Sequence, residues 1–589
     1  MTAAFLGIEQ SFTSRQWVAQ AYDERLALAL AQRYMLPDLI ARSLSARGLD
    51  LDTAPFFLEP RLRDLLPDPS RFKDMDKAAA RFAAAIQADE NIAVFGDYDV
   101  DGATAAALLM HFARAVGVSL RLYIPDRQKE GYGPNAGAMR QLSSEGVKVV
   151  VCVDCGITAH EPLAVARDAG LDVLVLDHHT AEPTLPPACA IVNPNRLDEE
   201  QNNYGTLAAV GVTYLFVVAV NRALRAAGWY SDERPEPDLL QWLDLVALGT
   251  VCDVVKLTGL NRAFVAQGLK IMEQRQNVGL DALARAAGIK GSFDAYAAGF
   301  ILGPRINAGG RVGQADIGAR LLAVNDPSEA IGLAERVNRF NAERRTIEDQ
   351  VRVEAEALVF DEKVPLIFVA SDNWHAGVLG IVASRLKDKF QRPAIVVGLE
   401  DGIGRGSGRS INGVDLGAAV IAARQAGLLI NGGGHKMAAG ITVKREAITA
   451  LREFLNERIG KQLAAEPLRP TLMLDGMAAG AALRVELIEK IAKLAPFGAG
   501  NAEPRFAVPD SRIIRAEVVG DRHVSLIVMN GGARVRAIAF RAMENGLGPA
   551  LLSRRGGMCH LAGCLRCDEW RGEKRVQLVL EDAADVRQT

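Results

Sequence analysis

The sequence predicts an α/β protein in which a parallel-sheet domain is joined by a long helix to a smaller α/β domain, followed by a C-terminal β-rich domain. Short apolar strands alternate with helices between residues 76 and 176, which is typical of a parallel, doubly wound sheet with right-handed crossovers. Residues 327–360 have the composition of a long helix with a strongly charged face, and short β segments dominate after residue 468. The chain has 589 residues, 49% of them hydrophobic, which indicates several cores rather than one.

Composition excludes several classes of protein. Charged residues make up 24% of the chain and the formal net charge is −3, so a nucleic-acid ligand would need a local basic groove. The seven scattered cysteines indicate a reduced, cytosolic protein without a disulfide framework. The first residues lack a signal-peptide pattern, and the longest apolar stretch, 210–220, is too short to cross a bilayer. We therefore expect a buried helix there and no membrane association.

The first two predicted parts are a helical extension and the parallel-sheet domain. Residues 1–75, rich in Leu, Ala and Arg, are expected to form the N-terminal helical extension, and the sheet domain is predicted over residues 76–290. Its strands are expected at 91–95, 119–124, 148–153 and 171–176, alternating with helices at 78–87, 103–116, 136–145 and 160–169. Helices dominate the domain from about residue 207 onward.

The remaining parts are a connector and two further domains. The connector is predicted over residues 291–360; its charged helix could be a solvated surface helix, but the composition changes on both sides, which favours a rigid connector. The smaller α/β domain is predicted over 361–465, with strands at 364–369 and 394–397 and a helix at 377–387. Short β segments within residues 466–589 predict a small barrel or sandwich; they lie at 506–516, 523–529, 533–541 and 576–581.

Three aspartates follow the first predicted strand directly. Asp97, Asp99 and Asp101 lie in the segment GDYDVDG, between that strand and a helix. If the segment is extended, alternation places the three carboxylates on one side, where they repel one another unless a cation is bound. The alternative is a set of solvated acids at a helix N-terminus, where Asp is favourable.

Two more strands and one helix end in acids or histidines, which favours a joint site. Asp154 follows the strand at 148–153, and Asp177, His178 and His179 follow the strand at 171–176. Asp253 ends an apolar helix. The carboxyl ends of parallel strands lie at one edge of a sheet, where such sheets bind their ligands.

The chemical types of the candidate ligands indicate which metal this site would bind. Carboxylates with imidazole, and no convincing thiolate, favour Mn²⁺ or Mg²⁺ over a structural Zn²⁺. Four or more acids around one point suggest two cations, an arrangement suited to phosphodiester cleavage. Asp154 is the candidate for a carboxylate that bridges both ions.

The segments GDYDVDG, VDCGI, LDHH and GTVCDVV, in that order, resemble the motifs of the DHH phosphoesterase family, and specifically of its RecJ branch. The resemblance implies that Asp99, Asp101, Asp154, His178 and Asp253 bind metal, and Asp97 is a further candidate ligand. It also implies that His179 lies beside the metals and contacts the substrate phosphate. Asp177 would orient a neighbouring histidine.

A second set of motifs is suited to binding phosphate. Arginines and glycines in GPRINAGGR form an expected glycine-rich loop, although a plain turn with surface arginines is the alternative. A histidine at a helix start, the segment RGSGRS and the run GGGH resemble the DHH-associated C-terminal domain. The predicted substrate-binding residues are Arg305, Arg311, His375, Arg385, Ser407, Arg409, Gly433, Gly434 and His435. By resemblance, His435 faces the metals and acts in catalysis with His179 and Asp154.

The C-terminal segment LAPFGAGN at 494–501 resembles the junction that leads into an OB-like domain, a fold that binds single strands by aromatic stacking in a basic groove. Phe540, Arg541 and Arg575 are candidate contacts there, with barrel core as the alternative for the aromatic residue. Cys564-x2-Cys567, near Cys559 and His560, has the form of a zinc motif, but its spacing is too cramped, so we expect no zinc site.

These features predict an exonuclease specific for single-stranded DNA that hydrolyses terminal phosphodiester bonds by a two-metal mechanism. The resemblance alone implies 5′-to-3′ polarity, release of 5′-mononucleotides, and a role in DNA repair and recombination. It also suggests single-strand-binding protein and a helicase as partners. The modest net charge gives no reason to expect an oligomer, so we expect a cytoplasmic monomer. One alternative is a DHH phosphodiesterase for short oligonucleotides or cyclic dinucleotides, but such relatives are usually shorter. Another is a non-catalytic replication scaffold, which should have lost metal carboxylates.

Overall fold

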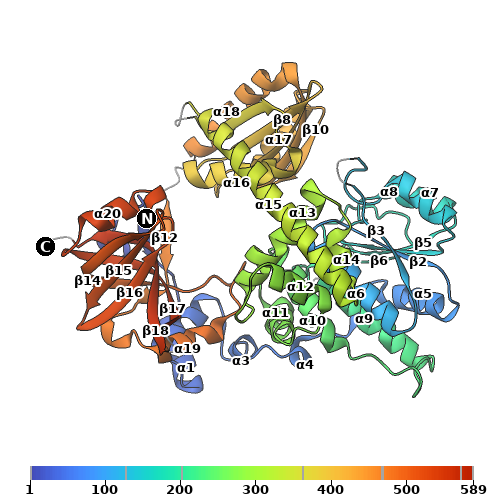
Figure 1. Cartoon of the computed structure of the whole chain (residues 1–589), viewed down its shortest axis with the longest axis horizontal. Helices are drawn as coiled ribbons and strands as arrows, with labels where there is room; N and C mark the ends of the chain where they lie inside the picture. The colour runs from blue at the N-terminus through green and yellow to red at the C-terminus, as the bar shows by residue number, and fades with distance from the viewer. Residues whose placement is uncertain are drawn as a thin grey trace. The chain divides into compact units, whose positions relative to one another are not determined.

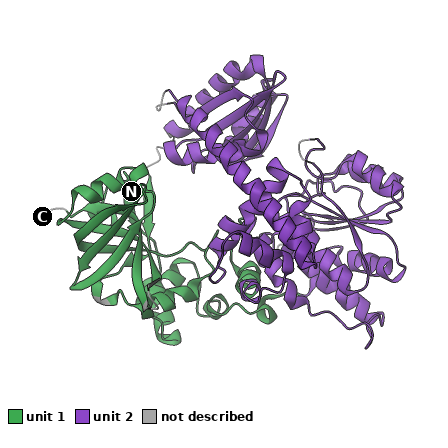
Figure 2. Cartoon of the chain, in the orientation of Figure 1, with its two compact units in different colours: residues 1–67, 254–267, 469–589 green, residues 68–253, 268–468 purple. Residues whose placement is uncertain are grey.

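The computed structural model of the chain describes residues 3–126, 129–199, 203–360, 364–465, 470–570 and 573–586. These residues form two compact units (Figure 2). The central unit comprises residues 68–253 and 268–468, and the terminal unit comprises residues 1–67, 254–267 and 469–589.

The first sheet of the central unit is parallel, as predicted. Its strand order is β3-β2-β4-β5-β6, formed by β2 (Ile92–Gly96), β3 (Leu120–Tyr123), β4 (Val149–Val153), β5 (Asp172–Leu176) and β6 (Ala190–Val192). Helices α5 (Met75–Gln87), α6 (Val100–Ala115), α7 (Ala136–Ser144), α8 (His160–Asp168) and α9 (Ala209–Ala226) surround it. Side chains of α7 and α8 share a core with the sheet, while α5, α6 and α9 pack on the sheet and on one another. The short strand β6 was not expected.

Helix α9 is longer than the apolar stretch suggested. It has 18 residues and is long and apolar enough to cross a membrane by composition, but 72% of it is buried inside the fold. Helices η3 (Leu239–Trp242), α10 (Leu243–Cys252), α11 (Gly259–Met272) and α12 (Val278–Ala286) follow. The first part of α11 belongs to the terminal unit.

The predicted glycine-rich loop at 303–311 is a helix instead. A π-helical turn, η4 (Ala297–Leu302), continues into α13 (Gly303–Val312), which is followed by α14 (Ile317–Ala323). The glycines allow close packing: a Cβ on Gly303 would lie 2.5 Å from the Cys252 sulfur, and one on Gly310 would lie 2.0 Å from the Tyr98 ring. Glycine content therefore reflects helix contacts here rather than a loop.

One long helix, α15 (Pro327–Ala357), leads to the second sheet, as predicted (Figure 1). Asp326 caps its N-terminus by accepting a hydrogen bond from the Glu329 amide. The second sheet has the order β10-β11-β9-β8-β7, and only β7 and β8 are parallel. Its elements are β7 (Ile367–Asp372), α16 (Ala376–Phe390), β8 (Ala394–Glu400), β9 (Ile403–Arg409), α17 (Leu416–Gln425), β10 (Asn431–His435), β11 (Ala438–Lys444), η5 (Arg445–Ala447) and α18 (Ile448–Ala465). Helix α16 packs on one face of the sheet, and α17 and α18 pack on the other.

The terminal unit contains the predicted β-rich domain. Its six-stranded sheet has the order β13-β14-β15-β16-β18-β17, and an additional pairing of β14 with β17 closes it into a barrel. The strands are β13 (Gly476–Met477), β14 (Arg505–Val519), β15 (His523–Asn530), β16 (Ala533–Ala539), β17 (Met558–Trp570) and β18 (Glu573–Asp585). The other elements after residue 470 are β12 (Thr471–Leu474), η6 (Gly480–Ala482), α19 (Val485–Ile491), η7 (Ala492–Leu494), η8 (Ala542–Glu544) and α20 (Leu547–Ser553). Cys559, Cys564 and Cys567 all lie on β17.

The N-terminal segment packs with this barrel and is not purely helical. Besides η1 (Phe5–Gly7), α1 (Glu24–Tyr34), α2 (Asp38–Ala46), α3 (Ala54–Leu58) and α4 (Leu62–Leu65), it contains β1 (Gln16–Ala19), which pairs in parallel with β12. The buried Trp17 indole donates a hydrogen bond to Asp582 over 3.0 Å. The strand depends on a partner more than 450 residues away, so local composition did not reveal it.

Candidate metal centre and adjoining pocket

Three neighbouring strands deliver acids to one edge of the first sheet. Gly96, Val153 and Leu176 end β2, β4 and β5 at matching register positions, and Asp97, Asp154 and Asp177 follow them directly. The parallel direction of these strands puts all three acids at the same carboxyl edge, as the sequence predicted.

The segment after β2 is fixed by hydrogen bonds from two helices. Asp99 caps α6, its carboxylate accepting a hydrogen bond from the Gly102 amide over 3.1 Å. The buried Asp101 carboxylate accepts from the amides of Ala209 and Val210, over 2.6 and 2.8 Å. These amides begin α9, which has no capping side chain of its own, so Asp101 serves as its cap.

Asp177 orients the second histidine. One of its carboxylate oxygens accepts from the backbone amide of His178 over 2.7 Å and from the ring nitrogen Nδ1 of His179 over 2.7 Å. The other oxygen accepts from the Ile157 amide over 3.0 Å. Burial lowers the pKa of His179, but the hydrogen bond and charge of Asp177 outweigh it and raise that pKa to about 9. His179 therefore carries a positive charge at neutral pH.

His178 differs from His179, because the pKa of His178 is lowered. Burial, and then the charge of His179, lower the pKa of His178, which keeps its imidazole neutral and able to bind a metal. Its Nε2 atom lies 3.2 Å from a carboxylate oxygen of Asp154, and its Nδ1 lies 3.7 Å from Asp253. Asp253 follows α10, so the helix and the strand β5 bring these groups together.

The acids and histidines form three overlapping groups. Within each group the candidate ligand atoms lie within 4.8 Å of one another; the groups are Asp97 with Asp99 and Asp154, Asp101 with His178 and Asp253, and Asp154 with His178 and His179. Asp154 belongs to two groups, as does His178. All six predicted metal ligands are thus brought to one place.

The chemistry of this centre fits a divalent cation. Burial and mutual repulsion raise the pKa of Asp101 and Asp154 well above the usual range, and burial with the charge of Asp99 raises that of Asp253 to about 7. Within the described part of the chain, Nε2 of His178 and one Asp253 oxygen are buried without a hydrogen-bond partner. Oxygen and imidazole ligands suit Mn²⁺ or Mg²⁺, and a bound cation would relieve both the repulsion and the missing contacts.

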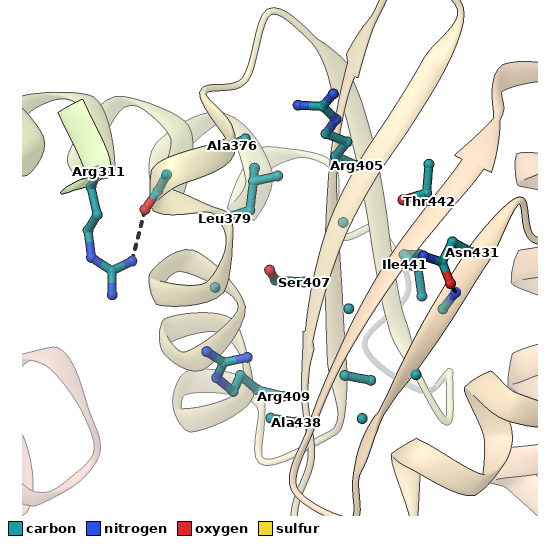
Figure 3. Close-up of a pocket in the computed structure, with 18 of the residues that line it drawn as sticks. Arg311, Ala376, Leu379, Arg405, Ser407, Arg409, Asn431, Ala438, Ile441 and Thr442 are labelled. Atoms are coloured by element: carbon teal, nitrogen blue, oxygen red, sulfur yellow. Dashed lines mark hydrogen bonds between the residues drawn. The ribbon is translucent and has the colours of Figure 1, made fainter. Parts of the chain in front are cut away.

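A pocket of about 620 Å³ lies between the second sheet and helices α13 and α16 (Figure 3). Arg311 of α13 donates a hydrogen bond to the Gly377 carbonyl over 3.0 Å, and Arg409 and Ser407 of β9 point into the same space. Burial, and then the charge of Arg311, lower the pKa of Arg409. Tyr98 also lines the pocket, and it lies between Asp97 and Asp99 in the acidic segment, residues 97–101.

The base of the pocket is formed by residues that lie opposite one another on adjacent strands of the second sheet. Gly433, Gly440 and Ser407 are register partners across three strands, and a Cβ on either glycine would meet no heavy atom within 4 Å. The missing side chains therefore leave space for a ligand. No Asp or Glu stands among the described residues that line this space, so its charge is positive.

Three predicted substrate-binding side chains have other contacts, and a fourth lies outside the pocket. Arg305 donates to Asn338 over 3.0 Å and to the Ile301 carbonyl over 2.6 Å, and Arg385 forms an ion pair with Glu348 over 3.3 Å. His375 caps α16, its Nδ1 accepting from the Gly377 amide over 3.1 Å. His435 is exposed at the end of β10 and does not line the pocket. Their roles with substrate stay predictions. Gly434, at φ +153°, lines the pocket, but a Cβ there would meet the Ala438 carbonyl at 2.3 Å.

Sequence reasoning missed several residues. The far end of the pocket is lined by three register partners on adjacent strands, Arg405, Thr442 and Asn431. Arg405 lies two residues before Ser407 on β9, so the alternation of side chains along that strand could have identified it. Asn195 donates to the His178 carbonyl over 2.6 Å, and Asn193 donates to the His179 carbonyl over 2.9 Å. No sequence signal linked these asparagines to the histidines.

Three segments match known domain families. Residues 91–250 match the DHH family, N-terminal domain; residues 363–461 match the DHHA1 domain; and residues 474–582 match the RecJ OB domain.

Curated proteins and solved structures resemble the chain over nearly its full length. The single-stranded-DNA-specific exonuclease RecJ of Bacillus subtilis is 34% identical over 97% of this chain and 71% of its own length. The protein of the same name from Escherichia coli is 33% identical over 93% of this chain and 96% of its own length. The crystal structure of RecJ in complex with Mn²⁺ from Thermus thermophilus matches with a TM-score of 0.80 and 28% identity, over 97% of this chain and 79% of the other. The Mg²⁺ complex of that protein matches with a TM-score of 0.74 and 26% identity, over 97% and 78% of the two chains.

Proposed function

Because the chain belongs to the RecJ family of single-stranded-DNA-specific exonucleases, we propose that it degrades single-stranded DNA from the 5′ end and releases 5′-mononucleotides. It is a metal-dependent exonuclease, with Mn²⁺ or Mg²⁺ as its cofactor. One observation carries the proposal: Tyr98 of the acidic segment lines a pocket whose described lining residues include three arginines and no acid. A cleavage centre and an anion pocket thus adjoin each other.

Two cations would be held by two of the ligand groups. Asp97, Asp99 and Asp154 would hold one, and Asp101, His178 and Asp253 the other, with Asp154 near both. When bound, two such ions polarise a phosphodiester and lower the pKa of water. The positively charged His179, held by Asp177, is placed to stabilise the negative charge that develops on the phosphate.

The pocket supports binding of a terminal 5′ phosphate. Such a phosphate carries roughly −1.5 to −2 charge at neutral pH, more than an internucleotide phosphate. Arg311 and Arg409 can form charge-assisted hydrogen bonds to it, and the Ser407 hydroxyl can donate a third. Binding the 5′ phosphate here would place the first internucleotide bond toward the metal centre.

Replacing Arg409 by alanine should raise KM for a 5′-phosphorylated strand by about 10- to 100-fold, because a charged hydrogen bond is worth about 1.5–3 kcal/mol. The loss should be smaller for the same strand with a 5′ hydroxyl. Steady-state digestion of both strands measures the difference. Lys444→Ala, which removes an exposed charge at the end of β11, is the matched control and should change neither KM. An equal loss on both strands would show that Arg409 does not recognise the terminal phosphate.

The cellular setting is part of the proposal. We propose action in the cytoplasm, in DNA repair and recombination, by a monomer that works with single-strand-binding protein and a helicase. The family resemblance supports these partners, and a helicase would supply the unpaired strand that the enzyme consumes. The barrel of the terminal unit matches the RecJ OB domain, and OB folds bind single strands.

The direct test is digestion of single-stranded DNA labelled separately at its 5′ and 3′ ends, with Mn²⁺ and with EDTA. The proposal predicts immediate, metal-dependent release of the 5′ label as a mononucleotide, while the 3′ label appears only at the end. Early release of the 3′ label would contradict the polarity. Binding without cleavage would favour a scaffold, and cleavage of only very short or cyclic substrates would favour a phosphodiesterase.

A further inference from the structure

Two exposed aromatic side chains stack on each other at the π-helical turn η4. The Tyr296 and Phe300 ring centroids lie 5.2 Å apart with an interplanar angle of 23°. Tyr296 is 58% exposed and Phe300 is 68% exposed, so neither ring contributes to the core of the central unit. Adjoining exposed aromatic rings form an apolar surface that is a candidate for an interaction site. Single π-helical turns within helices are also frequent at functional sites.

The turn that carries these rings packs directly beneath the metal centre. The Cys252 thiol donates to the Ala298 carbonyl over 3.5 Å, and a Cβ on Gly299 would lie 3.1 Å from Val251. Val251 and Cys252 are the residues immediately before Asp253, a candidate metal ligand. The inner face of η4 thus supports Asp253, and the outer face presents the two rings.

Arginines extend from the rings toward the pocket. Arg305 is on α13, one helical turn beyond Phe300, and its pKa is lowered by burial and then by the charges of Arg345 and Arg344. Arg345 is exposed on α15. Arg344 in turn lies near enough to Arg311 for that charge to lower its pKa further. Among these three arginines, Arg345 is the exposed one and could bind a phosphate, whereas Arg344 is buried against Glu348 and Arg305 donates to Asn338.

We propose that Tyr296 and Phe300 form a stacking platform for the unpaired bases of a DNA strand whose 5′ end occupies the pocket. This inference rests on the proposed function and extends it to the nucleotides that have not yet reached the metal centre. Every base has a flat π face, so stacking on aromatic rings is independent of sequence. Paired bases in a duplex are already stacked on their neighbours, so the platform favours single strands.

The test compares strands of different lengths. Alanine at both positions should raise KM for a long single strand by about 10- to 100-fold, because stacking on one aromatic side chain contributes about tenfold in affinity or more. The kcat should stay within about twofold, since neither ring contacts the scissile bond. In the proposed arrangement a 5′-phosphorylated dinucleotide occupies only the pocket and the metal centre and leaves no base for the rings, so its KM should not change.

Two controls make the result specific. The ring-preserving double variant Tyr296→Phe with Phe300→Tyr should behave like the wild type on every length. Phe360→Ala removes another exposed ring, beyond the end of α15, and should also leave the long-strand KM unchanged. In an Asp154→Ala background, quenching of a fluorescent base analogue placed along the strand should reveal stacking that the alanine variant lacks.

The outcomes separate the two proposals. An equal rise of KM on the dinucleotide and the long strand, or no rise on either, would overturn the platform while the nuclease activity itself remained. Loss of the stacking signal in the ring-preserving variant would also overturn it, because that variant keeps both aromatic rings. Absence of metal-dependent release by the wild type from both substrates would be a failure of the proposed function.

Discussion

Asp154→Asn is expected to lower kcat/KM on single-stranded DNA by about 10³-fold or more, a transition-state loss of about 4 kcal/mol. Asp154 belongs to two of the three ligand groups, and its carboxylate lies 3.2 Å from His178. Asparagine keeps the shape of the side chain but removes the negative charge that both cations would share. Asp154 is the carboxylate that two of the described ligand groups have in common, so one substitution should weaken both sites.

The same variant should be more stable than the wild type in EDTA. Burial and repulsion from Asp99 and Asp101 raise the pKa of Asp154, so its ionised form destabilises the metal-free fold. The destabilisation is present above the unfolded-state pKa and absent below it, where the group is protonated in both states. The gain in Tm should therefore be clear at pH 7 and small near pH 4. Excess Mn²⁺ should raise the Tm of the wild type much more than that of the variant.

An unchanged kcat/KM in Asp154→Asn would contradict the metal assignment. If the variant had a lower Tm than the wild type in EDTA, that result would contradict the proposed repulsion of the Asp154 carboxylate by Asp99 and Asp101. Asp244→Asn is a useful comparison, because burial raises the pKa of Asp244 to about 7 at a position outside the ligand groups. It should stabilise the metal-free protein in the same direction, without the thousandfold loss of activity.

Gly102→Ala is expected to lower kcat by about 100-fold and Tm by several degrees. A Cβ on Gly102 would lie 2.6 Å from the Asp97 carbonyl oxygen and 2.7 Å from the Asp97 nitrogen, distances that real Cβ atoms essentially never show. Because the atoms that obstruct this Cβ belong to the Asp97 backbone, the acidic segment must move to make room for alanine. That movement would also disturb the 3.1 Å hydrogen bond from the Gly102 amide to Asp99. Small displacements of metal ligands are costly in rate.

The matched control for this prediction is Gly332→Ala in the second turn of α15. A Cβ at Gly332 meets nothing within 4 Å, and its backbone is helical, so alanine should stabilise the helix by up to about 1 kcal/mol. Circular dichroism melting and metal-dependent digestion of both variants provide the comparison. Full activity in Gly102→Ala would show that the acidic segment tolerates displacement and that its geometry is not tied to catalysis.

Most residues of the candidate metal centre could be predicted, because they directly follow strands that the sequence indicates. Parallel strands end at one edge, so the acids after β2, β4 and β5 had to meet there once the strands were recognised. Asp253 follows a helix rather than a strand, and the family motif located it. The asparagines that hold the histidine backbone were missed, because their contact depends on how the chain returns after β6.

The arginine-lined pocket beside β9 was less predictable. In the sequence, the arginines at 305 and 385 looked as suited to binding phosphate as those at 311 and 409. In the structure, however, two residues of α15 engage the first pair: Asn338 contacts Arg305, and Glu348 contacts Arg385. Only the tertiary position of α15 decides which guanidinium groups face the pocket. Similarly, the glycines of α13 resemble a loop in sequence, but they allow Cys252 and the Tyr98 ring to pack closely against a helix.

The most direct test of this account is to count and locate manganese ions bound to the wild-type protein by anomalous X-ray diffraction. The account predicts two peaks roughly 3.5–4 Å apart, on either side of the Asp154 carboxylate and within reach of His178 and Asp253. Asp154→Asn crystals should lose at least one of them. A single peak away from the three ligand groups, or none in a protein that still digests DNA, would contradict the assignment of this edge of the sheet as the catalytic centre.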